Sequence, residues 1–356
     1  MPTDRKTLAQ FLKAERLPDD GTADDLRAII LDVSTACVAM SNRLATCAFD
    51  VHNGDTTGAD GQGEAPDQFT LLSDGRAVDG TARAQVLESL ANDIDRQQAA
   101  APCGLRSGRF LVTVIPFDNT SAMAAHAPGG TIFSILKAPG LARDAVVADF
   151  QQPGDQLVCA GYTFYGAATA LVLAIGREVG VFVLDRQAGQ FVLTRAGARV
   201  PEIGRQVAID TSNSRAWEPA IRRYFDECVA GESGPRGSNF QIHWTGSMVG
   251  EVHRILVTGG LFACPRHMRV PSLAKWPRLL QEANPISFIF ERAGGRATTG
   301  ITRVLDIEPS DILVRTPLIL GASSEVDRLV SYYVDPETGR YDTPLFGERG
   351  LFRATV

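Results

Sequence analysis

Apolar side chains recur at three- and four-residue steps along residues 24–49, and this spacing predicts an amphipathic helix. Its acidic start, Asp24 and Asp25, suits the positive N-terminal end of a helix dipole. The same period predicts further helices over residues 80–91, 218–231, 247–260 and 277–295. Gly231 and Gly259 stand where two of these helices are expected to end.

Shorter apolar runs between these segments predict β-strands. One run, residues 110–117, stops at Pro116, which cannot donate to a strand ladder. Further runs cover residues 130–136, 157–166, 170–176, 179–185, 189–197 and 204–210. A turn over residues 185–189 predicts a hairpin between two of them. Because strands and helices alternate along the chain, the pattern favours a layered α/β architecture.

Chain length bears on the number of domains. A chain of 356 residues is long for one hydrophobic core and comfortable for two. The pattern restarts near residue 203, so we expect an N-terminal domain over residues 1–202 and a C-terminal domain over residues 203–356. Residues 53–67 are rich in Gly, Asp and Thr and have no apolar period, which predicts a surface loop.

Composition excludes several classes of protein. The formal net charge is -6 and Lys and Arg do not cluster, so no nucleic-acid partner is expected. No run of eighteen apolar residues indicates a membrane span. The N-terminus is charged and lacks the apolar centre of a secretory signal, which predicts a cytoplasmic protein. The six cysteines are scattered without a CxxC pair, which argues against a structural zinc site or a disulfide framework.

Six segments, in their order and spacing, carry a family resemblance: GGTIFSIL (129–136), CAGYTFYGAATALVLA (159–174), LDRQAGQFVLT (184–194), GSMVGEVHRILVTGGLF (246–262), EANPISFIFERAGGRATTG (282–300) and LDIEPSDILVRTPLILGASSEV (305–326). They resemble class I fructose-1,6-bisphosphatase, and GPRGSNFQIHW (234–244) resembles the proteobacterial members. The resemblance implies a five-layer α-β-α-β-α sandwich of the fructose-1,6-bisphosphatase and inositol monophosphatase superfamily. It also implies metal in the N-terminal half, a sugar phosphate in the C-terminal half, and a homo-oligomer that is a tetramer or a dimer.

Hydrolysis of a sugar phosphate needs metal ions that gather the phosphoryl oxygens, carboxylates that hold those ions, and a base that activates water. The family motif Asp-Pro-Leu-Asp-Gly-Ser-Ser corresponds to Ile-Pro-Phe-Asp-Asn-Thr-Ser at residues 115–121. By this resemblance Asp118 remains, whereas the first aspartate is replaced by Ile115, which cannot ligate a cation. Asp93 and Ile94 stand at a pair of family glutamates, and Thr70 replaces a carboxylate that helps to activate water.

The resemblance therefore implies a depleted metal site. Asp118, Glu282 and Asp93 would hold Mg²⁺ or Mn²⁺ at reduced occupancy, or no metal would bind. Asp118 and Asp93 are also the candidate catalytic residues, and the base that activates water is unassigned. Alternatively, Asp118 and Glu282 cap helices or form internal hydrogen bonds, and Asp93 belongs to a solvated acidic face.

Candidate contacts to the small sugar phosphate come from both halves of the chain: Asn119, Thr120, Ser121, Asp210, His243, Trp244, Lys275 and Arg278. Backbone N–H groups after Asp118 would bind the phosphate. By resemblance His243 replaces an arginine that crosses a subunit boundary, so a permanent charge suited to phosphate is lost. Asp210 would repel a phosphate, and a second phosphate is therefore expected to bind weakly.

Three hypotheses for function follow. The first is a fructose-1,6-bisphosphatase-like phosphoric monoester hydrolase that acts on a sugar phosphate, with altered or weakened activity. The second is a catalytically inactive pseudophosphatase that binds a phosphosugar or a partner protein, which the residues Ile115, Ile94 and Thr70 motivate. The third is metal-free sugar chemistry in the same cleft, for which no particular pair of residues speaks.

Overall fold

Two β-sheets and their covering helices make up the computed structural model, which describes residues 5–15, 17, 21–47, 70–75, 108–118, 126–139, 146–266 and 276–335. The first sheet is antiparallel and has the order β1 (Thr70–Gly75), β2 (Gly108–Ile115), β3 (Gly129–Lys137), β4 (Leu157–Tyr165), β5 (Thr169–Ile175), β6 (Glu178–Asp185) and β7 (Gln190–Arg195). The second has the order β11 (Arg296–Thr298), β12 (Leu318–Gly321), β10 (Leu261–Cys264), β8 (Gln206–Ile209) and β9 (Gln241–His243). The helices are α1 (Leu8–Ala14), α2 (Ala23–Cys47), α4 (Pro219–Val229), α5 (Met248–Thr258), α6 (Asn284–Arg292) and α7 (Ser323–Val334).

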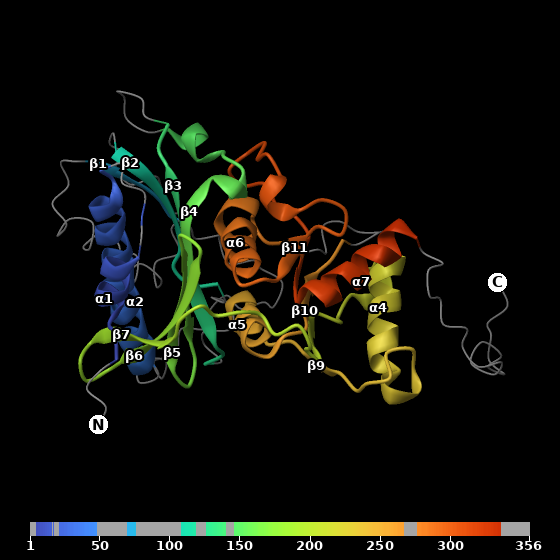
Figure 1. Ribbon diagram of the computed structural model, residues 1–356. Coiled ribbons are helices and arrows are strands. Elements are labelled where there is room, and N and C mark those ends of the chain that lie inside the picture. Colours follow the sequence, from blue (N-terminus) through green and yellow to red (C-terminus); the bar gives the residue numbers. More distant parts are fainter. Residues whose placement is uncertain are drawn as a thin grey trace, which may run out of the picture.

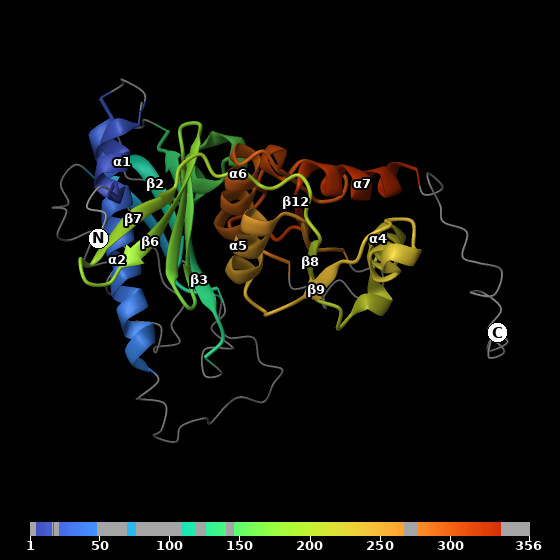
Figure 2. The same cartoon turned by 60° about the horizontal axis from the view of Figure 1, so that its bottom comes forward.

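These elements stack in five layers. Figure 1 shows α1 and α2, the first sheet, α5 and α6, the second sheet, and then α4 and α7, side by side in that order. Figure 2 shows the same succession after rotation. The expected α-β-α-β-α sandwich is confirmed, and the middle helical layer lies between the two sheets.

Both faces of the first sheet are covered, and strand β2 illustrates how. Phe110, Val112 and Val114 pack with the apolar side chains of α1 and α2. Leu111 and Ile115 point to the other face, into the core shared with α5 and α6. Because side chains alternate along a strand, a strand buried on both faces has a nearly continuous apolar sequence. This explains why the strands were evident from apolar runs without alternation.

The second sheet contains parallel neighbours. Strands β8 and β9 run parallel to each other, and β8 also runs parallel to β10. The carboxyl ends of these three strands therefore lie at one edge of the sheet. The chain approaches itself closely where β10 begins, because a Cβ atom on Gly260 (φ +105°) would lie 2.1 Å from the carbonyl oxygen of Gln206. Glycine is thus required there by both space and backbone conformation.

Helix α5 has clear start and stop signals. Ser247 is its N-cap, and the Ser247 hydroxyl accepts a hydrogen bond of 2.9 Å from the backbone N–H of Gly250. Gly259, with φ of 75°, ends the helix, which confirms the expected stop. The predicted hairpin is also confirmed, since β6 ends at Asp185 and β7 begins at Gln190.

The predicted helix over residues 277–295 is interrupted at its start. Residues Leu279–Ala283 form a π-helical turn, and regular α-helix begins only at Asn284. Pro285 lies in the first turn of α6, where its missing N–H costs nothing. A π-turn inserts an extra residue and is common at functional sites, and this one carries Glu282.

Helix α2 is long and apolar enough, by length and composition, to cross a membrane over Ala23–Ala45 (mean hydropathy 1.3). Core helices of soluble proteins have the same properties, and one stripe of α2, including Leu26, Ile30 and Val33, is packed in the core against the first sheet. The helix expected over residues 80–91 and the loop expected over residues 53–67 lie outside the described residues.

Candidate functional site

Asp118 connects the first sheet to the start of α5. It follows β2 closely and its carboxylate accepts hydrogen bonds from the backbone N–H of Gly130 at 2.7 Å and of Val249 at 2.8 Å. The Ser247 hydroxyl donates to the two carboxylate oxygens at 3.0 and 3.2 Å. Asp118 therefore occupies the positive end of the α5 dipole. These bonds are ones that the alternative role, a residue that caps a helix or forms internal hydrogen bonds, would make.

Burial raises the pKa of the Asp118 carboxyl to about 6. The hydrogen bonds from Val249, Gly130 and Ser247 oppose this rise, because they stabilise the ionised form. The negative charge of Glu282 raises the pKa of Asp118 further and is the smallest of these contributions. Among the described residues, this electrostatic effect is what links the two carboxylates that the sequence singled out.

Ile115 lies at the end of β2, where the family motif has its first aspartate. Its side chain is 4% exposed and belongs to the apolar core between the first sheet and the layer of α5 and α6. It pairs directly with Ile132 of β3. The position is therefore built as core, which agrees with the expectation that it provides no metal ligand.

Glu282 is held by the π-helical turn. Its Oε2 accepts a hydrogen bond of 2.6 Å from the backbone N–H of Arg278. Burial raises the pKa of Glu282, whereas that hydrogen bond and the positive charges of Arg278 and Arg315 lower it. The backbone of Arg278 thus holds the Glu282 carboxylate, and the charges of Arg278 and Arg315 favour its ionised form.

The fit of the site to metal can be judged from its oxygen atoms. Within residues 5–47, 70–75, 108–139, 146–266 and 276–335, as far as these are described, no three His, Cys, Asp or Glu side chains gather into a metal-binding group. Both oxygens of Asp118 already accept hydrogen bonds from the protein. Asp93, the expected third ligand, lies outside the described residues. Among the described residues, Asp118 and Glu282 alone do not make up a site for several cations, and we derive no catalytic step through a metal.

The phosphate-binding candidates are only partly described. Asn119, Thr120, Ser121 and Lys275 lie outside the described residues. Arg278 is described and is only 3% exposed. Burial lowers its pKa to about 10, helped by the nearby charge of Arg315 and opposed by Glu282, so Arg278 is still a cation at neutral pH.

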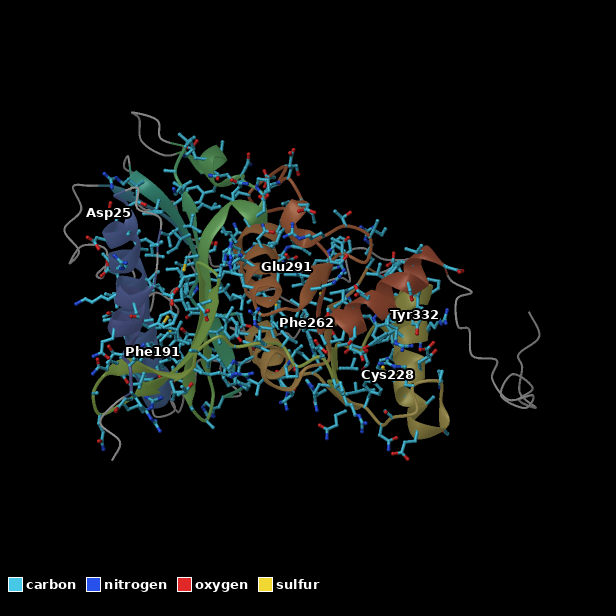
Figure 3. All side chains as sticks on the ribbon, viewed as in Figure 1. Asp25, Phe191, Cys228, Phe262, Glu291 and Tyr332 are labelled. Atoms are coloured by element: carbon cyan, nitrogen blue, oxygen red, sulfur yellow. The ribbon has the colours of Figure 1, made fainter. Side chains whose placement is uncertain are left out.

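His243 ends β9 and Trp244 follows it. The Nδ1 atom of His243 lies 2.6 Å from Oε2 of Glu251, a fully buried residue of α5. The same glutamate accepts a hydrogen bond from the backbone N–H of Thr245 at 2.5 Å. Trp244 is 39% exposed and stacks on Phe262, which Figure 3 places in the middle of the molecule. In this chain, therefore, His243 fastens β9 to α5.

Asp210 is within the described part of the chain. It follows β8, and its Oδ1 accepts a hydrogen bond of 2.9 Å from the backbone N–H of Ser212. Burial raises the pKa of Cys264, at the end of β10, to about 12, and the charges of Glu282 and Asp210 add to the rise while Arg315 opposes it. Asp210, Cys264, Glu282 and Arg315 thus share one region at the carboxyl ends of β8 and β10.

Arg315 is a member of this region that the sequence analysis did not name. It is exposed, and its Nη1 donates a hydrogen bond of 2.7 Å to the carbonyl oxygen of Trp276. It precedes the apolar strand β12, and an arginine at the mouth of a buried strand was the only available signal. Its approach to Arg278 could not be foreseen, because it depends on a pairing between distant segments.

Known proteins are similar to this chain over nearly its whole length. The family model described as fructose-1-6-bisphosphatase, N-terminal domain, matches residues 6–196, and the C-terminal domain model matches residues 200–334. The chain is 40% identical over 353 residues to "Fructose-1,6-bisphosphatase class 1 3" of Methylibium petroleiphilum, covering 99% of both chains. It is 40% identical to class 1 fructose-1,6-bisphosphatases of Hydrogenophilus thermoluteolus, over 98% of this chain and 97% of that one, and of Rhodospirillum rubrum, over 99% of both.

Solved structures support the fold. The holo form of Leishmania major fructose-1,6-bisphosphatase superposes with a TM-score of 0.73 at 24% identity, covering 93% of this chain and 100% of that chain. The T-state structure of the same protein gives a TM-score of 0.72 at 23% identity, covering 93% and 99%. At this identity the structures establish the architecture alone, whereas the sequence matches extend over nearly the full length. The chain belongs to the class 1 fructose-1,6-bisphosphatase family of sugar-phosphate phosphatases.

Proposed function

We propose that this protein hydrolyses a phosphoric monoester of a sugar, in the manner of fructose-1,6-bisphosphatase but with altered or weakened activity. The observation that carries the proposal is that Asp118 and Glu282, the two carboxylates that the resemblance assigns to metal, come from opposite halves of the chain and that the charge of Glu282 acts on Asp118. Arg278 and Arg315 supply positive charge beside them. Full-length relatives that bear the name fructose-1,6-bisphosphatase set the substrate class.

The divalent ion is part of the proposal. Mg²⁺ or Mn²⁺ would supply charge neutralisation at the phosphoryl oxygens. We propose that Asp118, Glu282 and Asp93 hold it at reduced occupancy, because Ile115 is apolar and Asp118 must exchange its bonds to α5. Asn119, Thr120, Ser121 and Arg278 would bind the phosphate, and Asp210 would disfavour a second one. We further propose a cytoplasmic homo-oligomer that acts on a small sugar phosphate, with neither nucleic acid nor membrane as a partner.

A phosphate-release assay tests the main proposal. The full-length protein is given a panel of sugar phosphates, including fructose 1,6-bisphosphate, with Mg²⁺ or Mn²⁺. We expect metal-dependent release that Glu282→Gln abolishes and that the matched variant Glu291→Gln retains, since Glu291 forms an ion pair with exposed Arg303. Release that is equal in both variants would contradict the role of Glu282.

The second candidate function, a pseudophosphatase, is favoured by one observation. Each oxygen of Asp118 already has protein donors, so the carboxylate is satisfied without a cation. If no sugar phosphate of the panel releases phosphate, and one of them raises the melting temperature when it binds, this function is selected over hydrolysis.

Restoring the lost carboxylates separates the two functions further. Ile115→Asp with Ile94→Glu should lower stability without metal by several kcal/mol, because a charge then replaces a core side chain at position 115. If the site has lost only these two ligands, Mg²⁺ should restore much of the lost stability of the double variant, seen as a higher melting temperature. A melting temperature that Mg²⁺ does not change would show that the remaining oxygens do not converge on an ion.

A further inference from the structure

The main chain of residues 116–118 is attached to the start of β3 by bonds that do not use the Asp118 carboxylate. The backbone N–H of Asp118 donates to the carbonyl oxygen of Gly130 at 2.9 Å. The hydroxyl of Thr131, a buried residue of β3, donates to the carbonyl oxygen of Pro116 at 2.6 Å. These two bonds extend the contact between β2 and β3 beyond the end of β2, and they fix the place at which Asp118 leaves the sheet.

Tyr165, the last residue of β4, lies behind Thr131 and extends this anchor. The two hydroxyl oxygens are 2.7 Å apart, and both side chains are buried. Because the single hydroxyl proton of Thr131 goes to the carbonyl oxygen of Pro116, Thr131 accepts the bond from Tyr165. Burial raises the pKa of the Tyr165 hydroxyl, so Tyr165 keeps the proton that it donates. The result is a chain of two hydrogen bonds, which strengthen each other.

The ring of Tyr165 also packs on Phe117, the residue before Asp118. The two rings are stacked, with centroids 6.2 Å apart and an interplanar angle of 17°. On another side Phe117 closes over Gly129, where an added Cβ atom would lie 2.2 Å from the Cζ atom of Phe117. Tyr165 therefore restrains this segment twice, through the hydroxyl of Thr131 and through the ring of Phe117.

This restraint matters because the side-chain bonds of Asp118 cannot hold it in place during a reaction. The bonds from Gly130, Ser247 and Val249 all use the carboxylate oxygens. Any reacting group that Asp118 serves must use the same oxygens, so these bonds are exchanged. The anchors at residues 116–118 use backbone and ring atoms and persist, and a functional group has to be held to within about 0.5 Å.

We propose that Thr131 and Tyr165 are positioning residues of the candidate site, whose hydroxyl chain holds residues 116–118 so that the Asp118 carboxylate keeps its place while its oxygens change partners. This inference rests on the proposed function for the reaction that Asp118 serves. In this role neither Thr131 nor Tyr165 contacts the substrate. The competing role of the hydroxyl chain is to stabilise the sheet alone, and the two roles predict different results.

Kinetics of the full-length protein with a sugar phosphate separate the two roles. Thr131→Val removes the central hydroxyl of the chain and keeps the shape of the side chain. We expect kcat to fall about tenfold or more with KM within about twofold, because a misplaced Asp118 impairs the reaction more than the binding of substrate. Thr131→Ser keeps the hydroxyl and should retain most of the wild-type kcat.

Thr113→Val is the matched control for these kinetics. Thr113 and Ser134 lie opposite each other on the same two strands, and their buried hydroxyl groups form a hydrogen bond of 2.8 Å. This variant should keep kcat within about twofold, although it also removes a buried hydroxyl from the sheet. Equal kcat in the two valine variants would overturn the inference, and so would a Thr131→Ser protein as impaired as Thr131→Val.

A double-mutant cycle tests the same coupling without any activity. Urea denaturation gives the stability of Asp118→Ala, of Thr131→Val and of the protein with both changes. If the hydroxyl chain places the carboxylate, Asp118→Ala destabilises the Thr131→Val protein less than it destabilises wild type. In the Thr113→Val background the effect of Asp118→Ala should equal that in wild type. Additive effects in both backgrounds would contradict the inference.

Two further results are covered by this design. If Thr131→Val fails to fold, Tyr165→Phe replaces it in both tests, because this change removes the donor hydroxyl and keeps the ring on Phe117. If the wild-type protein releases no phosphate, the proposed function is refuted, and the cycle still decides whether the hydroxyl chain holds Asp118. Active hydrolysis that Thr131→Val leaves unchanged supports the proposed function and overturns the inference.

Discussion

At the scale of single residues, the carboxylate of Asp118 is both a candidate metal ligand and a hydrogen-bond acceptor that stabilises the fold. It satisfies the N–H groups of Gly130 and Val249 and the hydroxyl of Ser247, so it stabilises the start of α5 whether or not a cation binds. A cation would have to compete with these donors for the same lone pairs. Stability and metal affinity are therefore opposed at this residue.

Asp118→Ala should lower the free energy of unfolding by about 2–4 kcal/mol, because it leaves two backbone N–H groups without acceptors. Urea denaturation without metal measures the loss. Asp155→Ala serves as a control, because Asp155 is exposed and its carboxylate accepts a hydrogen bond from the side chain of its neighbour Gln156. Equal stability of the two variants would mean that the bonds to α5 contribute nothing.

His253 predicts a dependence of stability on pH. Burial lowers its pKa to about 4, and its Nδ1 lies 3.1 Å from the hydroxyl of Tyr162. Below about pH 6.5 the His253 imidazole binds a proton in the unfolded chain, whereas in the folded chain it stays neutral until about pH 4. The free energy of unfolding is therefore unaffected by His253 above pH 6.5 and falls as the pH drops from 6.5 towards 4. The full loss is on the order of 3 kcal/mol.

Because the raised pKa of Asp118 acts in the opposite direction over part of the same range, the test compares two proteins. The stability difference between wild type and His253→Gln, from urea titrations at pH 7 and pH 4.5, should shift in favour of the variant at the lower pH. A difference that does not change with pH would show that His253 does not titrate below its ordinary range.

At the scale of elements, α4 and α7 are joined by buried polar groups. Arg236 pairs with Glu325 at 2.7 Å, with side chains 6% and 11% exposed, and the hydroxyl of Tyr224 donates to the same glutamate at 2.5 Å. Figure 3 labels Cys228 and Tyr332 on these two facing helices, and both belong to the apolar cluster between them. The outer layer therefore depends on the pair being complete.

Glu325→Gln should destabilise the protein by roughly 3–5 kcal/mol, because Arg236 would keep a buried charge without its partner. Arg303→Gln breaks a more exposed ion pair and should cost about 1 kcal/mol or less. Urea midpoints of the two variants give the comparison. Similar urea midpoints for the two variants would show that water solvates the Arg236 guanidinium once Glu325 is replaced.

The elements themselves were largely predictable. Leu26, Ile30 and Val33 show the period of α2 directly, and Gly259 marks the end of α5, because both signals are local. The interruption at Leu279–Ala283 was not evident, since a π-turn leaves the apolar stripe almost unchanged. The candidate site was harder still: Asp118 and Glu282 emerged from the resemblance, but the bond from Val249 to Asp118 spans 131 residues and has no local signal.

At the scale of the molecule, one core joins the two halves. Leu111 and Ile132 of the first sheet, Val252 of α5, Phe288 of α6 and Leu320 of the second sheet all belong to a single apolar cluster. The division at residues 202 and 203 stays a prediction about domains. The shared core nevertheless implies that neither half can lose its structure without exposing the apolar face of the other.

The protein should therefore unfold in one cooperative transition. Its three tryptophans, Trp217, Trp244 and Trp276, all lie in the second half, so their fluorescence reports on that half, whereas far-ultraviolet circular dichroism reports on the whole chain. We expect the two urea curves to coincide. A fluorescence transition that precedes the circular dichroism transition would show that the halves unfold separately.

The position of Glu282 depends on the number of residues in the π-helical turn Leu279–Ala283. The turn contains one residue more than an α-helix would use, and that surplus directs Glu282 back to the amide of Arg278. Shortening the chain here by one residue would let the helix wind regularly and rotate the carboxylate by about 100°. The location of this acid is thus encoded in chain length as much as in residue identity.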